Sequence, residues 1–162
     1  MRGKAKGRWI HAAIESMLVS NQAAAEVLYE YGVTACTDVT GFGVLGHLVE
    51  MTKAPGCDVD LMIDTLPLLD GALETVSVGI LSSLQPQNVR LRRAITNVGQ
   101  WNSHSVYPFL FDPQTAGGLL ASIPEEKAEA CLSGLRAQGY QSAVLVGRVK
   151  QRGTEDAAIT LI

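Results

Sequence analysis

Cysteines and long apolar runs are scarce in this sequence, and each scarcity excludes a class of protein. Three cysteines occur among the 162 residues, at Cys36, Cys57 and Cys131, and no two of them form a C-x-x-C pair. Because their number is odd and their spacing wide, we predict neither a disulfide framework nor a structural zinc site. This usage favours a reducing, cytoplasmic location. No apolar run approaches the roughly 20 residues of a membrane-spanning helix, so no membrane partner is expected.

A surplus of basic residues and two common functional patterns are also missing. The formal net charge is −3 at pH 7, which argues against a general nucleic-acid binder. No segment matches the pattern G-x-x-x-x-G-K-S/T, so a Walker-type phosphate loop is excluded. His11 and His104 stand apart from the His, Asp and Glu spacings that are typical of metal clusters.

The chain contains enough hydrophobic residues, 47%, to bury the core of one domain. Their periodicity predicts helices over 9–18, 22–31, 43–52, 67–76 and 124–138. It predicts strands over 34–39, 57–63, 106–111, 119–123, 144–149 and 157–162. Residues 79–105 show little periodicity, and either a long active-site lid or an irregular connection fits them. The alternation of helices and strands indicates one α/β (α+β) domain, in which helices pack on a mixed sheet.

An acidic residue, a glycine turn and the start of a helix follow one another over residues 37–46. Gly41 and Gly43 allow close approach of a ligand to the backbone, and N–H groups at a helix N-terminus attract phosphate oxygens. Asp38 alone would repel phosphate, but Mg²⁺ binds carboxylate and phosphate oxygens together. The segment therefore indicates a metal–phosphate site. The alternative is a glycine turn in which Asp38 is only a cap or turn former. His47 fits a surface or packing role better than a phosphate contact.

The same glycines also match the pattern G-x-G-x-x-G over 41–46, which is typical of dinucleotide-binding domains. Asp64 lies near the end of the next predicted strand, where an acid that binds ribose is expected in such domains. Three observations weaken this alternative. The preceding strand is polar, Asp38 would face the pyrophosphate without a metal, and two amphipathic helices precede a strand that should open the fold.

A second loop, over 112–118, has similar ingredients between two predicted strands. Pro113 fixes the turn, and the paired glycines Gly117 and Gly118 allow close backbone approach. Asp112 is placed to orient a ligand or a partner loop. A purely structural turn explains this segment by itself. The presence of two such loops in one small domain, however, predicts that both border one site.

Two long segments resemble the signatures of the selenophosphate synthetase (selenide, water dikinase) family. They are ACTDVTGFGVLGHL at 35–48 and DPQTAGGLL at 112–120. Shorter matches lie at 6–9, 16–18 and 20–21, so the resemblance covers nearly the whole chain. The second signature usually has serine where this chain has Ala116, which puts one hydroxyl contact in doubt. The family is part of the aminoimidazole-ribonucleotide-synthetase-like group of ATP enzymes.

The resemblance implies a fold like the C-terminal domain of that group, partly ferredoxin-like. It implies an enzyme that makes selenophosphate, AMP and phosphate from selenide, ATP and water, with Mg²⁺ neutralising the transferring phosphoryl groups. Residues 1–162 would form the C-terminal domain. Family members also have an N-terminal domain, which carries the reactive cysteine or selenocysteine, a lysine and most of the metal-binding aspartates, and no such segment is present here. We therefore expect this chain to be inactive alone, with the N-terminal domain as its partner and a homodimer as the intact enzyme.

Individual roles follow from the matched positions. Asp38 is assigned to Mg²⁺, and no residue of this chain is assigned as catalytic. The residues expected to border the bound nucleotide are Thr40, Gly41, Gly43, Asp112, Gln114, Thr115, Gly117 and Gly118. Two alternatives remain open: another member of the same superfamily, such as a purine-pathway synthetase or a hydrogenase maturation factor, and a non-catalytic interaction domain.

Overall fold

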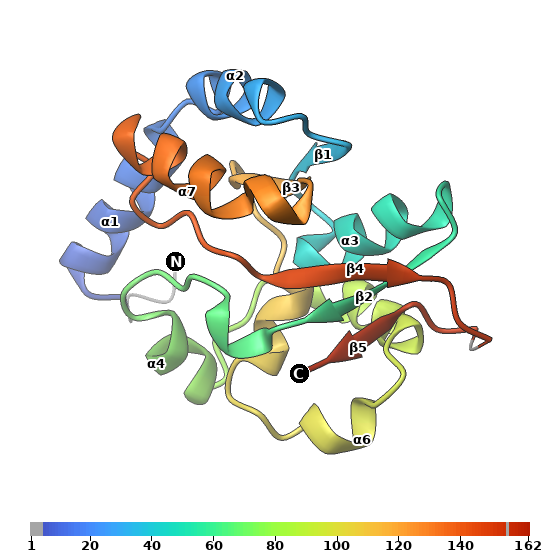
Figure 1. Cartoon of the computed structure of the whole chain (residues 1–162). Helices are drawn as coiled ribbons and strands as arrows, with labels where there is room; N and C mark the ends of the chain where they lie inside the picture. Colours follow the sequence, from blue (N-terminus) through green and yellow to red (C-terminus); the bar gives the residue numbers. More distant parts are fainter. Residues whose placement is uncertain (1–4, 155) are drawn as a thin grey trace.

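The residues that the computed structural model describes, 5–154 and 156–162, form two β-sheets (Figure 1). The strands are β1 (Ala35–Asp38), β2 (Cys57–Leu61), β3 (Leu119–Ser122), β4 (Gly147–Gln151) and β5 (Ile159–Leu161). β1 and β3 pair antiparallel, whereas β2 lies between an antiparallel β4 and a parallel β5. The prediction of a mixed α/β fold is confirmed, but the strands are divided between two sheets.

Helices of two lengths surround these sheets. The longer ones are α1 (Gly7–Leu18), α2 (Gln22–Glu30), α3 (Gly43–Lys53) and α7 (Ala128–Ala137). The shorter α-helices are α4 (Ala72–Ser77), α5 (Gln85–Asn88) and α6 (Val98–Trp101). The 3-10 helices are η1 (Ile63–Thr65), η2 (Val89–Ala94), η3 (Tyr107–Phe111) and η4 (Glu125–Lys127). In the described part of the chain, no helix has the length and apolar character needed to cross a bilayer.

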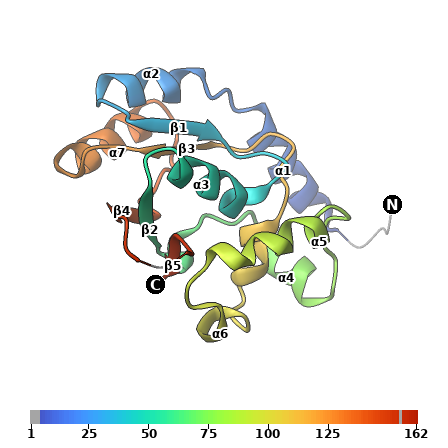
Figure 2. The same ribbon diagram turned by 90° about the vertical axis from the view of Figure 1, so that its right-hand side faces the viewer.

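Each sheet has its own hydrophobic cluster. The larger cluster joins β2 and β5 to α3 and η3, and its most buried members are Leu45, Leu61, Ile63, Leu110, Phe111, Ile159 and Leu161. The smaller cluster lies where α2 and α7 pack beside β3, and its members are Ala24, Val27, Leu28, Cys131 and Leu135. Figure 2 shows α3 between the β1–β3 sheet and β2. Because α3 contacts both sheets, it connects the two halves of the domain.

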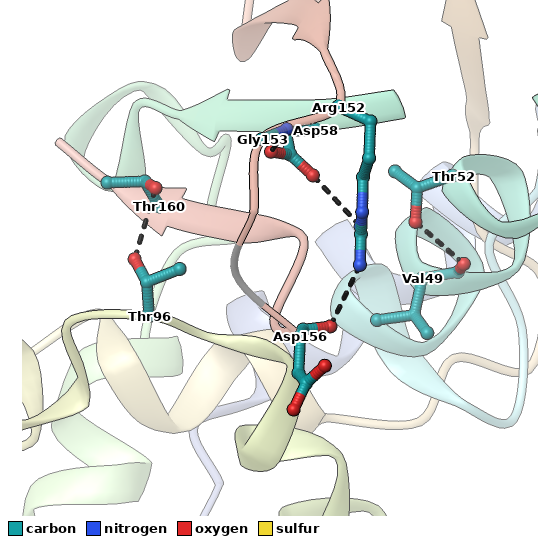
Figure 3. Close-up of polar contacts among 8 residues, drawn as sticks. All are labelled: Val49, Thr52, Asp58, Thr96, Arg152, Gly153, Asp156 and Thr160. Carbon is teal, nitrogen blue, oxygen red and sulfur yellow. Dashed lines mark hydrogen bonds and ion pairs between the residues drawn. The ribbon is translucent and has the colours of Figure 1, made fainter. Parts of the chain in front are cut away.

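The alternating pattern of β2 sends apolar side chains to the core and acids to the other face, as predicted. Val59 and Leu61 are buried. Asp58 accepts hydrogen bonds from Arg152 Nη1 at 2.9 Å and from the backbone N–H of Gly153 at 2.8 Å. Arg152 Nη2 also donates to the backbone oxygen of Asp156 at 3.0 Å (Figure 3). The Asp58 carboxylate therefore fixes the connection between β4 and β5.

Local structure departs from the predictions in three places. Residues 107–111 form the 3-10 helix η3 and not a strand, because Pro108 fixes its own φ near −65° and has no N–H to donate to a ladder. The helix expected from residue 67 begins only at Ala72, since Gly71 adopts the left-handed φ of 81°. The strand expected from residue 144 begins at Gly147.

Residues 79–105 form an ordered connection of short helices, which favours the second of the two interpretations. Ile95 is buried and pairs with Ile159 of β5, and Thr96 donates its N–H to the carbonyl of Ile159 at 2.8 Å. The hydroxyls of Thr96 and Thr160 lie 3.1 Å apart, also visible in Figure 3. Asn97 exchanges two hydrogen bonds with the backbone of Leu161, at 2.8 and 3.0 Å. The segment thus extends the edge of the larger sheet.

Gly71 and Gly79 form a matched pair for testing how α1 is attached. Both have a positive φ, but only at Gly71 would a Cβ overlap another side chain, the ring of Trp9 on α1. We expect Gly79→Ala to lower the free energy of unfolding by about 1–2 kcal/mol through backbone strain. Gly71→Ala should cost about 1–3 kcal/mol more, because the Trp9 ring must move. Urea denaturation measures both, and equal losses would show that the Trp9 contact contributes nothing.

Candidate functional site

The two loops singled out by the sequence lie side by side. We define the first loop as residues 38–43 and the second loop as residues 112–118. The β1–β3 ladder brings Asp38 opposite Leu119. Beyond it, the N–H of Val39 donates to the carbonyl of Gly118 at 2.9 Å, and the N–H of Gln114 donates to the carbonyl of Thr40 at 3.0 Å. The two loops are therefore adjacent, as residues that border one site must be.

Glycine is required in these loops largely because the loops touch one another. A Cβ on Gly117 would overlap the carbonyl oxygen of Val39. Gly43 has a φ of 69°, and a Cβ there would lie 2.9 Å from the carbonyl oxygen of Leu110. In contrast, a Cβ on Gly41 or Gly118 would meet no atom within 4 Å. The sequence predicts that the glycines allow a ligand to come close to the backbone. At Gly43 and Gly117, other protein backbone occupies that space instead.

Asp38 is exposed at the end of β1. Within the described residues, no hydrogen bond or ion pair holds its carboxylate. The same residues contain no group of three His, Cys, Asp or Glu side chains arranged to hold a metal. The carboxylate raises the pKa of nearby Cys36, although partial burial of the thiol is the larger cause of that shift. Cys36 therefore stays protonated at neutral pH and is not an activated nucleophile.

His47, on α3, holds the first loop through its contact with Thr40. Its side chain is buried, with only 9% exposed. Nε2 accepts a hydrogen bond from the backbone N–H of Thr40 at 2.9 Å and lies 3.2 Å from the Thr40 hydroxyl. Accepting from a backbone N–H requires a lone pair on Nε2, so this contact needs the tautomer that carries its proton on Nδ1. Of the two roles considered for His47, the packing role is the one observed.

Two asparagines that the sequence did not assign to the site bind the loops through their side-chain amides. Asn88, at the end of α5, donates from Nδ2 to the carbonyl of Gly41 at 2.8 Å and to that of Phe111 at 3.1 Å. Asn21 donates from Nδ2 to the carbonyl of Gly117 at 3.0 Å. Asn21 lies in the short family match at 20–21, which assigns it no contact, and Asn88 lies in the segment without periodicity. Neither position carries a pattern that would have revealed its contact.

Asp112 lies at the start of the second loop and is half-buried. Burial raises the pKa of its carboxyl group, and a hydrogen bond from Gln114 Nε2 to Oδ2, at 3.0 Å, partly offsets this increase. Gln114 and Thr115 themselves are exposed. Two shallow hollows run along α2, lined by residues such as Gln22 and Glu26, and neither includes a residue of either loop.

The topology removes the dinucleotide-binding alternative. That fold needs the strand before the glycine pattern and the strand after it to lie parallel in one sheet. Here β1 and β2 belong to different sheets. Gly46, the last glycine of the pattern, is packed against Phe42 and Leu91. Asp64 lies in η1, with a carboxylate oxygen 3.2 Å from Nε2 of His104.

Comparison with known proteins places this arrangement in a family. The family described as AIR synthase related protein, C-terminal domain, matches residues 11–159. The chain belongs to this family. In a structure of the Escherichia coli hydrogenase maturation protein HypE, the matching part has a TM-score of 0.61 and 18% sequence identity, covering 90% of this chain and 37% of that chain. This likeness supports the fold alone.

Similar curated proteins include several selenide, water dikinases. The enzyme of that name from Caldanaerobacter subterraneus subsp. tengcongensis is 38% identical over 144 residues, which are 89% of this chain and 42% of the relative. The one from Pelobacter propionicus is 37% identical over 142 residues, 88% of this chain and 41% of the relative. The chain is homologous to these enzymes, as its two signatures had predicted, and spans less than half of their length.

Gly117 and its neighbour Gly118 test the junction between the loops. We expect Gly117→Ala to lower the free energy of unfolding by about 1–3 kcal/mol, because the new methyl group collides with the rigid backbone of Val39. Gly118→Ala has open space and should change stability by no more than about 0.5 kcal/mol. Thermal and urea unfolding measure both. A Gly117→Ala variant as stable as Gly118→Ala would contradict the close contact.

The pKa of Asp112 provides a second test. Because its folded-state pKa is raised above the usual value of 3.8, the stability that it contributes is present at lower pH and is lost as the pH rises through the folded-state pKa. Carbon-13 NMR of the carboxyl group should therefore show a titration midpoint above 3.8. Gln114→Ala should raise the midpoint further, since it removes the hydrogen bond that stabilises the ionised form. A lower midpoint in Gln114→Ala would contradict this assignment.

Proposed function

We propose that this chain is the C-terminal domain of a selenide, water dikinase, a phosphotransferase that makes selenophosphate, AMP and phosphate from selenide, ATP and water. The observation that carries the proposal is the junction of two signature loops beside the exposed carboxylate of Asp38. Homologues bearing that enzyme name, 33–38% identical, support it. Homology to HypE at 18% identity gives less support to the hydrogenase maturation alternative.

Asp38 is the residue of this chain that would hold Mg²⁺. A hard cation binds carboxylate oxygens, and the Asp38 carboxylate has no competing partner among the described residues. Bound Mg²⁺ would neutralise charge on the phosphoryl groups. Since the described residues supply no cluster of three ligands, the other ligands in this proposal come from the remainder of the enzyme. The chain alone is therefore inactive in our proposal.

The two loops would border the phosphates of ATP. Gly41 and Gly118 leave open space above the backbone, so a ligand can come close at those two positions. Thr40 is held by His47, and Gly43 begins α3. The residues of the second loop with this role are Asp112, Gln114, Thr115, Gly117 and Gly118. In this arrangement the chain orients the nucleotide and contributes no catalytic side chain.

Exposed apolar side chains on and beside α1 and α4 support docking of a partner domain. α1 has no buried residue, and Figure 2 shows α1, α4 and α5 on one side of the molecule. The exposed apolar side chains of α1, of α4 and of the segments next to them are Ile10, Ile14, Met17, Leu18, Val19, Leu69, Leu73, Val78, Leu81 and Leu84. Extended exposed apolar patches mark interaction surfaces. We propose that the N-terminal domain of the enzyme covers this surface. A homodimer of the intact enzyme and a cytoplasmic location complete the proposal.

The function is tested in a chimaera, in which this chain replaces the matching part of the Caldanaerobacter selenide, water dikinase. We expect selenide-dependent AMP formation by the chimaera and none by the isolated chain. Asp38→Asn should lower the rate by about 100-fold, because loss of a metal ligand removes several kcal/mol of charge stabilisation. AMP is quantified by chromatography and selenophosphate by phosphorus NMR.

Asp156→Asn is the matched control. Like Asp38→Asn, this substitution removes one negative charge from an exposed carboxylate, here beside β5. The hydrogen bond that Asp156 accepts from Arg152 goes to its backbone oxygen and not to its carboxylate. The control variant should retain the rate of the unmodified chimaera. Full activity of Asp38→Asn, or AMP formation by the isolated chain, would contradict the proposed function.

A further inference from the structure

Asn88 occupies an unusual position for a side-chain amide. Only 6% of its surface is exposed, and both of its carbonyl partners lie far away in the sequence. A buried amide is costly unless its donors are satisfied, and the NH₂ group of Asn88 has one acceptor for each of its two hydrogens. Among side chains, only an amide or a cation can donate two hydrogen bonds from one nitrogen atom.

One acceptor belongs to the first loop, and the other lies directly before the second loop. Gly41 lies in the middle of the first loop, and Phe111 immediately precedes Asp112, where the second loop begins. The direct hydrogen bonds between the loops involve Val39 and Thr40 only. The far half of the first loop, beginning at Gly41, is therefore joined to the base of the second loop by the Asn88 amide.

The element that carries Asn88 is itself anchored to η3. Gln85 lies one helical turn earlier on α5 and is 3% exposed. Its Nε2 donates to the carbonyl of Pro108 at 2.6 Å. Leu91, three residues after Asn88, lies close to Gly46 on α3. A Cβ added to Gly46 would be 3.0 Å from Cδ1 of Leu91. α5 and η2 thus support both loops. They are attached to η3 by the hydrogen bond of Gln85 and to α3 by the packing of Leu91.

We infer that Asn88 is a positioning residue that locks the two loops into one ligand-binding surface. The amide lies beneath the loops and touches no ligand. It acts through the carbonyls of Gly41 and Phe111, which it holds in a fixed relation. Gly41 has no Cβ to restrict its backbone, so the amide supplies the restraint that a side chain would otherwise give. The ligand named in this inference, Mg-ATP, rests on the proposed function.

Asn97→Ala is the matched control for Asn88→Ala. Both asparagines belong to the 79–105 connection, and each makes two hydrogen bonds to distant backbone. Those of Asn97 go to Leu161 in β5, away from the loops. Both variants should lower global stability. Only Asn88→Ala should loosen the site.

Amide hydrogen exchange of the 162-residue chain measures this difference. The reporters are the N–H groups of Gly43 and Gln114, which both donate to the carbonyl of Thr40. In Asn88→Ala we expect them to exchange at least tenfold faster than in the wild type, while the N–H of Val59 in β2 changes much less. In Asn97→Ala the N–H of Leu161 should accelerate, with the loop reporters unchanged relative to Val59. If Asn88→Ala does not fold, Asn88→Ser is compared with Asn97→Ser in the same way.

Kinetics of the chimaera provide the second readout. Asn88→Ala should lower kcat/KM for Mg-ATP by about tenfold, and Asn97→Ala should leave it unchanged. Loop reporters that accelerate no more than Val59 in Asn88→Ala would overturn the inference, as would an unchanged kcat/KM. Accelerated loop reporters together with an unmodified chimaera that forms no AMP would support the locking role of Asn88 and reject the proposed function.

Discussion

The close contact between two backbone segments at the end of the β1–β3 ladder is the constraint on which the site depends. Val39 and Gly118 continue the ladder by one hydrogen bond, and Gly117 lies so close to the carbonyl of Val39 that no side chain fits. This contact brings Asp38 beside the second loop. His47, Asn21 and Asn88 then hold the same backbone from three other elements. Several parts of the domain therefore converge on the two loops.

The site combines a well-supported backbone with very few charged groups. Asp38 is exposed and unpaired among the described residues, which contain no group of three metal ligands. Asp112 is half-buried and its pKa is raised. A surface of this kind orients a ligand but supplies little of the charge needed for phosphoryl transfer. The apolar surface around α1 and α4 agrees with a partner that would supply the remainder.

The sequence predicted those elements in which a local pattern determines the structure. The alternation around Val59 appears as expected, and the helix predicted over 22–31 ends just before Gly32, which has a positive φ. The predictions were wrong where one residue overrides a pattern, as Pro108 does in η3 and Gly71 does before α4. The contacts of the site could not be predicted from the sequence for another reason. Asn88 and Gly41 are 47 positions apart, and hydrogen bonds between distant positions leave no periodicity in one sequence.

We propose that a divalent cation and ATP bind where the two loops meet, and only when the remainder of the enzyme is present. Paramagnetic relaxation of backbone amides by Mn²⁺, in place of Mg²⁺ and with ATP present, measures this location directly. In the chimaera, the account predicts the fastest relaxation at residues 38–43 and 112–118, and in the isolated chain no such enhancement. Fastest relaxation elsewhere, for example along α2, or the same enhancement in the isolated chain, would contradict the account.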